Sequence, residues 1–171
     1  LLAEYLGGAT ATGEFTDRWR TPGSAHSRTW EDRFGEQAYL PLVKQAWADA
    51  LEATGLSTDD VTVAVATGLH GRATKKAASG LGVAIADDRS ATVGNSGAAH
   101  PSLLLADVLD GAEAGAVVAL VVLADGCEVL FFRATDALAA GRPARSVAIQ
   151  VDDRPTWRTP ATWRGGACWR S

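Results

Sequence analysis

The clearest candidate for chemistry in this chain is an asparagine enclosed by glycines, in the run Gly-Asn-Ser-Gly at residues 94–97. Residues 90–93, before the run, have the composition of a short strand, and residues 98–109, after it, have the spacing of a helix. At such a bend Asn95 can aim its amide N–H groups at a ligand. It can equally be a plain turn residue, because asparagine tolerates the left-handed backbone. The spacing alone leaves both interpretations open.

A second bend with polar side chains reads Thr-Gly-Leu-His-Gly-Arg at residues 67–72. It follows a β-branched run at 61–67, which predicts a buried strand, and precedes a predicted short helix at 72–79. His70 can serve as an acid or base near neutral pH, whereas the hydroxyl of Thr67 can only form hydrogen bonds. His70 also fits a partly exposed histidine at the start of a helix. We expect the two bends to converge on one pocket.

Three cations, Arg72, Lys75 and Lys76, stand beside the second bend. Cations next to backbone donors suit anions, so this cluster is our candidate for binding phosphate groups. A solvated helix face explains the same three residues, and that alternative stays open.

The cysteines are poor candidates for a nucleophile. Cys127 lies in a predicted hairpin and Cys168 in the tail, and neither precedes a helix N-terminus that would lower its pKa. The three histidines are at no zinc-finger spacing, and there is no Cys-x-x-Cys pair. We therefore expect no metal site and no permanently bound cofactor.

The bulk composition is that of an ordinary globular domain of 171 residues, 47% hydrophobic and 21% charged, with a formal charge of −4. No basic stripe is concentrated anywhere, so nucleic acid is not an expected partner. The longest apolar run, 116–124, is too short to span a bilayer. Two cysteines without a disulfide framework favour a cytoplasmic location.

The order of predicted elements is that of an α/β domain in which helices are layered on a sheet. Residues 1–38 read as a loop-rich entry segment, residues 39–135 as the layered domain, and residues 136–171 as an extended tail that contains Trp and Pro. Within the layered domain we expect helices at 39–54, 72–79 and 98–109, strands at 61–67 and 90–93, and a strand pair at 117–123 and 128–133 joined by Asp-Gly.

Several stretches, in this order, resemble the C-terminal half of 3-hydroxy-3-methylglutaryl-CoA synthases of the bacterial and archaeal type, members of the thiolase-like superfamily. They are Glu-Phe-Thr-Asp-Arg-Trp-Arg at 14–20, Arg-Phe-Gly-Glu-Gln-Ala-Tyr at 33–39, the strand, turn and helix end at 63–82, Gly-Asn-Ser-Gly-Ala-Ala at 94–99, and Thr-Trp-Arg-Gly at 162–165. The turn at 94–99 is also similar to that of type III ketoacyl synthases.

The resemblance implies a thiolase-like half-domain whose N-terminal half is not present in this chain. Such enzymes carry out a Claisen-type condensation through an acyl-cysteine, with the cysteine and a catalytic glutamate in the N-terminal half. Asn95 matches the asparagine that holds the developing oxyanion. The implied substrate is an acyl-CoA or acyl-carrier thioester. The implied partners are the missing half, a second copy in a homodimer, and an OB-fold and zinc-ribbon protein.

The chain departs from the family at the catalytic histidine. Where the family has His-Gln-Pro-Asn-Gly-Lys, this chain has Thr67 in the histidine's place and His70 in that of the later asparagine. Two hypotheses follow: an enzyme part that works with the missing half, and a catalytically degenerate thiolase-fold subunit with a structural or partner-binding role. A nucleotide-binding domain is disfavoured, because no Gly-rich phosphate loop follows a strand. The absence of methionine suggests an excerpt of a longer protein.

Overall fold

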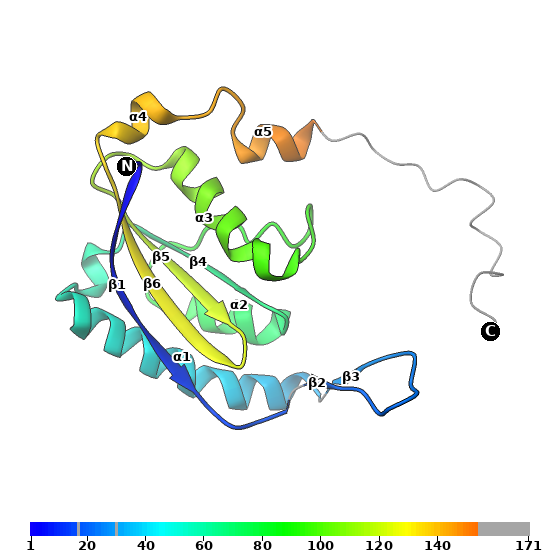
Figure 1. The fold of residues 1–171 in the computed structure, drawn as a ribbon. Coiled ribbons are helices and arrows are strands. Elements are labelled where there is room, and N and C mark those ends of the chain that lie inside the picture. Colours follow the sequence, from blue (N-terminus) through cyan, green and yellow to red (C-terminus); the bar gives the residue numbers. More distant parts are fainter. Residues whose placement is uncertain (17, 30, 154–171) are drawn as a thin grey trace.

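A mixed β-sheet organises the protein in the computed structural model, which describes residues 1–16, 18–29 and 31–153 (Figure 1). Within these residues the sheet has the strands β1 (Ala3–Thr12), β4 (Val63–Gly68), β5 (Val117–Leu123) and β6 (Gly126–Ala134), in the order β1-β6-β5-β4. β4 and β5 are parallel, while β6 is antiparallel to both of its neighbours. β1, β4 and β5 therefore run in the same direction and end at the same edge of the sheet.

Sequence explains why β4, at one edge of the sheet, and β5, beside it, are buried within the protein. Both are runs of Val, Ala and Leu that are buried almost throughout, as expected for strands covered on both faces. The turn from β5 into β6 needs glycine at its end, because Gly126 has a φ of +145° and a Cβ there would lie 3.0 Å from the Cα of Thr12. The predicted Asp-Gly hairpin is thus confirmed.

Helices cover both faces of the sheet. α1 (Asp32–Thr54) and α2 (Gly71–Ser79) pack on one face, and α3 (His100–Gly111) packs on the other, with α5 (Val147–Asp152) against it. Alternation along β4 gives each face its own core: Ala64 and Ala66 belong to the cluster beneath α1 and α2, and Val65 to the smaller one beneath α3. The predicted α/β class with a layered sheet is confirmed.

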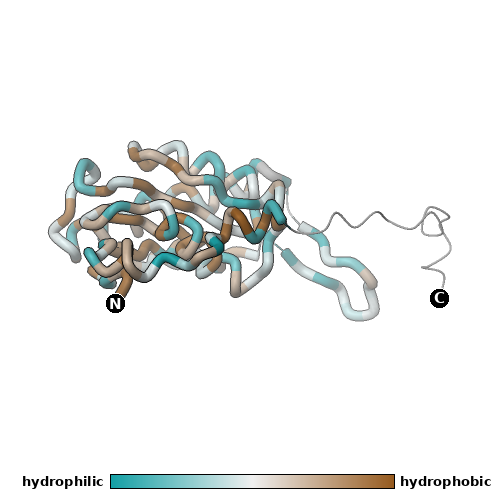
Figure 2. The backbone as a smooth tube through the Cα atoms, turned by 90° about the horizontal axis from the view of Figure 1, so that it is seen from above, coloured by the Kyte–Doolittle hydropathy of each residue, from teal (hydrophilic) through white to brown (hydrophobic). Residues whose placement is uncertain are grey.

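The remaining elements are short. They are β2 (Arg18–Trp19), β3 (Arg28–Thr29), α4 (Ala137–Gly141) and two 3-10 turns, η1 (Thr58–Asp60) and η2 (Gly97–Ala99). β2 and β3 pair antiparallel and form a hairpin of residues 18–29, hereafter the arm, which projects from the body (Figures 1 and 2). Its hydropathy is mostly polar to neutral, in contrast to the brown strands of the sheet in Figure 2.

The expectation of a loop-rich segment over residues 1–38 is wrong for much of its length. Residues 3–12 form β1, and α1 begins at Asp32, seven residues before the predicted start of the helix. β1 has no clean alternation, because Gly7 and Gly8 interrupt it at a bulge in its pairing with β6. The strand exists because it pairs with β6 and lies on α1, which are contacts distant in sequence.

Two other predictions are also wrong. Residues 90–93 form a turn, and the chain instead makes an isolated bridge between Ile85 and Ala64 on the outer side of β4. The described part of the tail contains α4 and α5, so it is not simply extended. The tail's tryptophans and Cys168 lie outside the described residues. In the described ranges, no helix combines the length and apolar character needed to cross a membrane.

Candidate functional site

The two glycine-containing bends meet at the edge where β1, β4 and β5 end. The side-chain Nδ2 of Asn95 donates a hydrogen bond to the backbone carbonyl of Gly68, at 3.3 Å, across 27 positions of sequence. Gly68 pairs with Leu123 at the end of β5, and a Cβ on Gly68 would lie 2.9 Å from the Cβ of Leu123. Glycine at 68 therefore lets β5 and the bend approach closely. The two bends are therefore in contact in the structure, and a pocket between them stays a prediction.

Asn95 is held in a defined orientation by its own bend. Its Oδ1 accepts a hydrogen bond from the N–H of Gly97 at 2.8 Å, while its Nδ2 reaches Gly68. Gly94 and Gly97 have φ values of +75° and +68°, so glycine is needed on both sides. An amide carries two N–H groups, and the contact with Gly68 uses one of them. The second remains for a ligand, since Asn95 is exposed.

Thr67 lies next to the same contact, one residue before Gly68. It is only 5% exposed, and alternation along β4 puts it on the α3 face together with Val65. Its hydroxyl makes no hydrogen bond to the residues that the structure describes. Thr67 is thus a sequence neighbour of the residue that Asn95 contacts, and its side chain is buried.

His70 is placed differently. It is the N-cap of α2, where its Nδ1 accepts a hydrogen bond from the N–H of Ala73 at 3.2 Å. Its ring packs on α1, because a Cβ on Gly35 would fall within 2.7 Å of three ring atoms, and the ring of Tyr39 lies 6.4 Å away. The arrangement favours the alternative of a histidine at the start of a helix.

A carboxylate lies within the predicted phosphate-binding cluster of Arg72, Lys75 and Lys76 and pairs with two of these cations. Glu36, on α1 and 7% exposed, forms ion pairs with both Arg72 and Lys76, the latter at 2.7 Å. The hydrogen bond from Lys76 is the largest cause that holds the pKa of Glu36 below its ordinary value of 4.5, against the opposing effect of desolvation, and the charge of Arg72 adds to it. Two of the three predicted cations therefore join α2 to α1.

Lys75 lines one pocket of about 680 Å³ together with Glu36, Arg72 and Lys76, and it also lies near Asp88. Burial raises the pKa of Asp88, but hydrogen bonds from Ser90 and the charge of Lys75 outweigh it and leave the pKa below its ordinary value. Lys75 and Asp88 line the same pocket of about 390 Å³ beneath the 85–91 segment. Arg72, Lys75 and Lys76 therefore line a common pocket in which Glu36 pairs with two of them, and their role in binding phosphate stays a prediction.

Sequence analysis missed one residue that shapes the site, His100. It is 2% exposed, and its ring nitrogens lie 3.2 Å from the hydroxyl of Ser96 and 3.0 Å from the carbonyl oxygen of Asp88. Ser96 is adjacent to Asn95, so His100 anchors that bend from the start of α3. The signal that could have found it is the spacing of four residues between Ser96 and His100, which places them one helical turn apart.

Cys127 does not have the properties of a nucleophile. It is 1% exposed on β6, and desolvation, with the nearby charge of Glu128, raises its pKa to about 12. Within residues 1–16, 18–29 and 31–153, no group of three or more His, Cys, Asp and Glu side chains is placed to hold a metal ion.

No protein-family model matches this chain, and no curated protein matches it.

Proposed function

We propose that this chain is the C-terminal part of an acyl-CoA condensing acyltransferase, similar to hydroxymethylglutaryl-CoA synthases, and that Asn95 stabilises the oxyanion of its thioester substrate. The single observation that carries the proposal is the hydrogen bond from Asn95 to the carbonyl of Gly68. It joins two bends, each leading into a helix, at the edge of the sheet where strands end. The mixed sheet with helices on both faces is compatible with a thiolase-like half-domain.

The proposed condensation requires hydrogen-bond donors whose positions are fixed before negative charge develops on the thioester oxygen. A pre-oriented N–H at a developing oxyanion contributes about 10²–10³ in rate, because it needs no rearrangement during the reaction. Asn95 meets this requirement, since contacts with Gly68 and Gly97 fix both ends of its amide. The hydroxyl of Thr67, one residue before Gly68, would be the second donor.

The acyl-carrying nucleophile must come from elsewhere. Cys127 is buried with a pKa of about 12, so a negligible fraction is thiolate near neutral pH. The proposal therefore assigns the cysteine and the glutamate acid–base group to a preceding half of the same protein. A homodimer and a zinc-ribbon and OB-fold partner belong to the same proposal, through the family resemblance alone.

The test is Asn95→Ala in the complete protein, with single-turnover condensation of acetyl-CoA and acetoacetyl-CoA as the readout. We expect the rate to fall by at least about tenfold. Asn95→Asp is the matched variant, because it keeps an oxygen that can accept from Gly97 but has no N–H to donate. Both variants should fold, as judged by circular dichroism. Unchanged turnover in both would remove Asn95 from the site.

A second candidate function, a degenerate subunit with a structural or partner-binding role, is favoured by the state of His70. Its ring caps α2 and packs on α1, so it is not placed as a replacement for the family's histidine. Thr67→Val separates the candidates, because it removes the hydroxyl and retains the shape. Condensation that falls at least about tenfold supports the enzyme part. If no condensation is detectable in the wild type, the subunit role is favoured.

A further inference from the structure

A serine hydroxyl and a histidine ring meet where the bend at 94–97 leads into α3. The Oγ of Ser96 lies 3.2 Å from Nδ1 of His100, the first residue of α3, and the two positions are about one helical turn apart. Ser96 is exposed, whereas His100 is only 2% exposed. The hydroxyl is therefore open to a ligand, while the ring nitrogen behind it is shielded from water.

A third group fixes which ring nitrogen carries the proton. Nε2 of His100 lies 3.0 Å from the backbone carbonyl oxygen of Asp88, and a carbonyl oxygen can only accept a hydrogen bond. In the neutral ring Nε2 therefore donates to Asp88, which leaves Nδ1 to accept from the hydroxyl of Ser96. A nucleophile, a base and a group that orients the base are thus arranged as nucleophilic catalysis by serine requires.

The carboxylate of Asp88 favours a positive charge on the same ring. Desolvation raises the pKa of Asp88, but hydrogen bonds from Ser90 and the charges of Lys75 and His100 outweigh it and hold the pKa below its ordinary value. An imidazolium at His100, which forms when the ring takes the proton of a serine, is therefore stabilised by a nearby negative charge.

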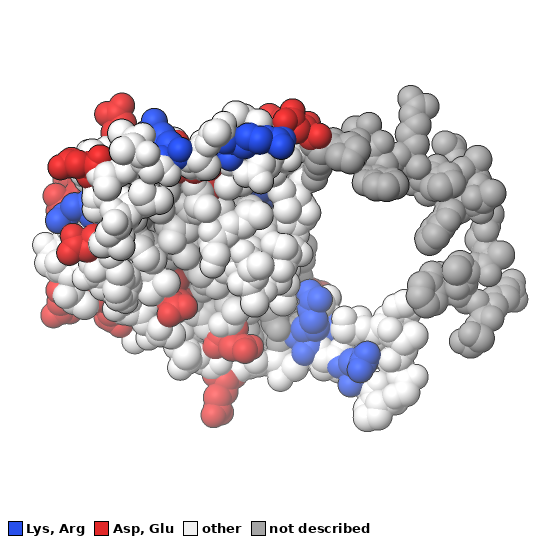
Figure 3. Space-filling view, turned by 45° about the horizontal axis from the view of Figure 1, so that its top comes forward, with Lys and Arg blue, Asp and Glu red and all other residues white. Residues whose placement is uncertain are grey.

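The surroundings of Ser96 in the chain favour an uncharged substrate. Residues 90–106 contain no Lys, Arg, Asp or Glu, and residues 95–99 are all exposed. On the side of the molecule seen in Figure 3, uncharged surface likewise lies between the blue side chains of the arm and the charged groups along the upper margin. An open and uncharged turn fits a small neutral acyl group whose leaving group stays in solvent.

We propose that Ser96 is the nucleophile and His100 the general base in the hydrolysis of small neutral carboxylic esters. The Oγ of Ser96 forms a bond to the carbonyl carbon, and its proton passes to Nδ1 of His100. The bond from this carbon to the alcohol oxygen then breaks, and the departing alcohol takes that proton. Water, deprotonated by the same ring, attacks the acyl-serine, so that the acid is released and Ser96 regains its proton. This activity does not rest on the proposed condensation, in which neither residue takes part.

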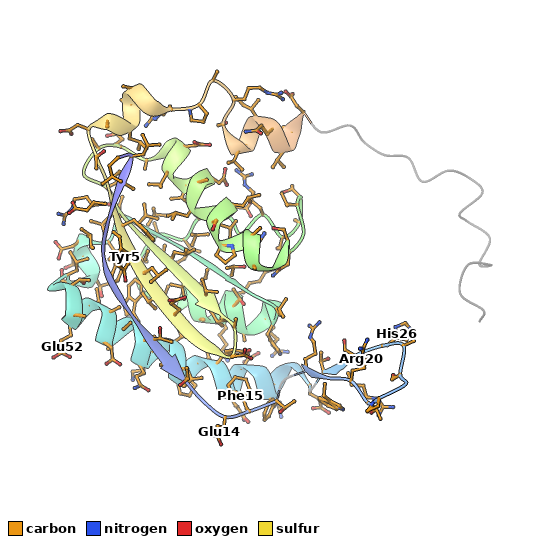
Figure 4. All side chains as sticks on the ribbon, viewed as in Figure 1. Tyr5, Glu14, Phe15, Arg20, His26 and Glu52 are labelled. Carbon is orange, nitrogen blue, oxygen red and sulfur yellow. The ribbon has the colours of Figure 1, made fainter. Side chains whose placement is uncertain are left out.

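The arm offers a matched serine and histidine that lack this contact. The hydroxyl of Ser24 donates to the backbone carbonyl of His26, at 3.0 Å, and not to its ring. Both residues are exposed, and in Figure 4 His26 lies far out on the arm, away from α3. Ser24 therefore reports how an exposed serine near a histidine reacts without a general base.

The test uses two neutral probes on the complete protein, after iodoacetamide has blocked reactive cysteines. Diisopropyl fluorophosphate traps an activated serine irreversibly, because the serine Oγ displaces fluoride from phosphorus. Mass spectrometry of peptides should show that it labels Ser96 at least about a hundredfold faster than Ser24, as expected for general-base catalysis. Ser96→Ala should also slow the hydrolysis of p-nitrophenyl acetate at least about tenfold, whereas Ser24→Ala/His26→Gln should leave it unchanged.

The variant His100→Gln tests the base. It should reduce the labelling of Ser96 to the rate of Ser24 while circular dichroism shows a folded protein; if it does not fold, the comparison of Ser96 with Ser24 in the wild type decides. The inference is overturned if the two serines are labelled at similar rates, if Ser96→Ala hydrolyses the ester at the wild-type rate, or if folded His100→Gln is labelled at Ser96 as fast as the wild type.

Discussion

Gly35→Ala tests how α1 and the second bend are joined. A Cβ at this position would lie 2.7 Å from Cε1 of His70 and closer still to Nε2 and Cδ2. The ring cannot simply rotate away, because its Nδ1 accepts the hydrogen bond that caps α2. The substitution must therefore displace either the cap or the helix.

The expected magnitude follows from three opposing effects. In a helix interior, alanine is favoured over glycine by about 1 kcal/mol. Loss of an N-cap costs about 1 kcal/mol, and overpacking at a close contact costs about 1–3 kcal/mol. Gly35→Ala should therefore destabilise the protein by about 1–3 kcal/mol, although helix propensity alone predicts the opposite sign.

Urea unfolding of a double-mutant cycle measures this effect. In a His70→Ala background the obstacle is gone, so Gly35→Ala should stabilise by up to about 1 kcal/mol. Gly111→Ala, at the end of α3, is a matched control, because nothing lies within 4 Å of its new Cβ. If Gly35→Ala is neutral or stabilising in the presence of His70, the packing described here is wrong.

Three further predictions concern charge and reactivity. Glu36→Gln should lower the free energy of unfolding at pH 7. Folding lowers the pKa of Glu36, so the stabilisation by its carboxylate is present above pH 4.5 and is lost as the pH falls through the folded value. Urea unfolding in acid should therefore show a smaller difference in stability between the wild type and Glu36→Gln than at pH 7. Cys127 should resist iodoacetamide at pH 8 until the protein unfolds, and rapid labelling in the native state, read by mass spectrometry of its peptide, would contradict its burial. Arg89→Lys should destabilise the protein by about 1 kcal/mol in urea unfolding, because lysine cannot make both of the contacts of 2.6 and 3.0 Å that Arg89 makes to Asp107. A loss of stability no larger than that of Lys44→Gln, at an exposed position, would refute this.

The elements that could be predicted from the sequence are those whose patterns are local. β4, β5 and β6 follow from runs of apolar residues, and α2 and α3 from helical spacing between glycines. β1 could not be found in this way, because its pairing partner lies more than a hundred residues later and its own glycines weaken the pattern. The same limit applies to Ile85, whose single bridge depends on the position of β4.

The candidate site was predictable in position and less so in its contacts. The glycines around Asn95 and at Gly68 indicated two bends, and these are brought together in the fold. The sequence could not reveal that Glu36 pairs with Arg72 and Lys76, because α1 and α2 meet only in the folded chain. The roles of Asn95, Thr67 and His70 in a reaction stay predictions.

The pairing of β1 with β6 has a consequence for how the protein is made. β1 has no neighbour in the sheet until β6, which ends at Ala134, has been synthesised. Because long-range pairing slows folding, β1 should stay unpaired, and exposed to chaperones and proteases, while the residues between it and β6 are being made. The hydroxyl of Thr135 then also donates to the backbone carbonyls of Leu1 and Leu2, which secures the start of β1 to the end of β6.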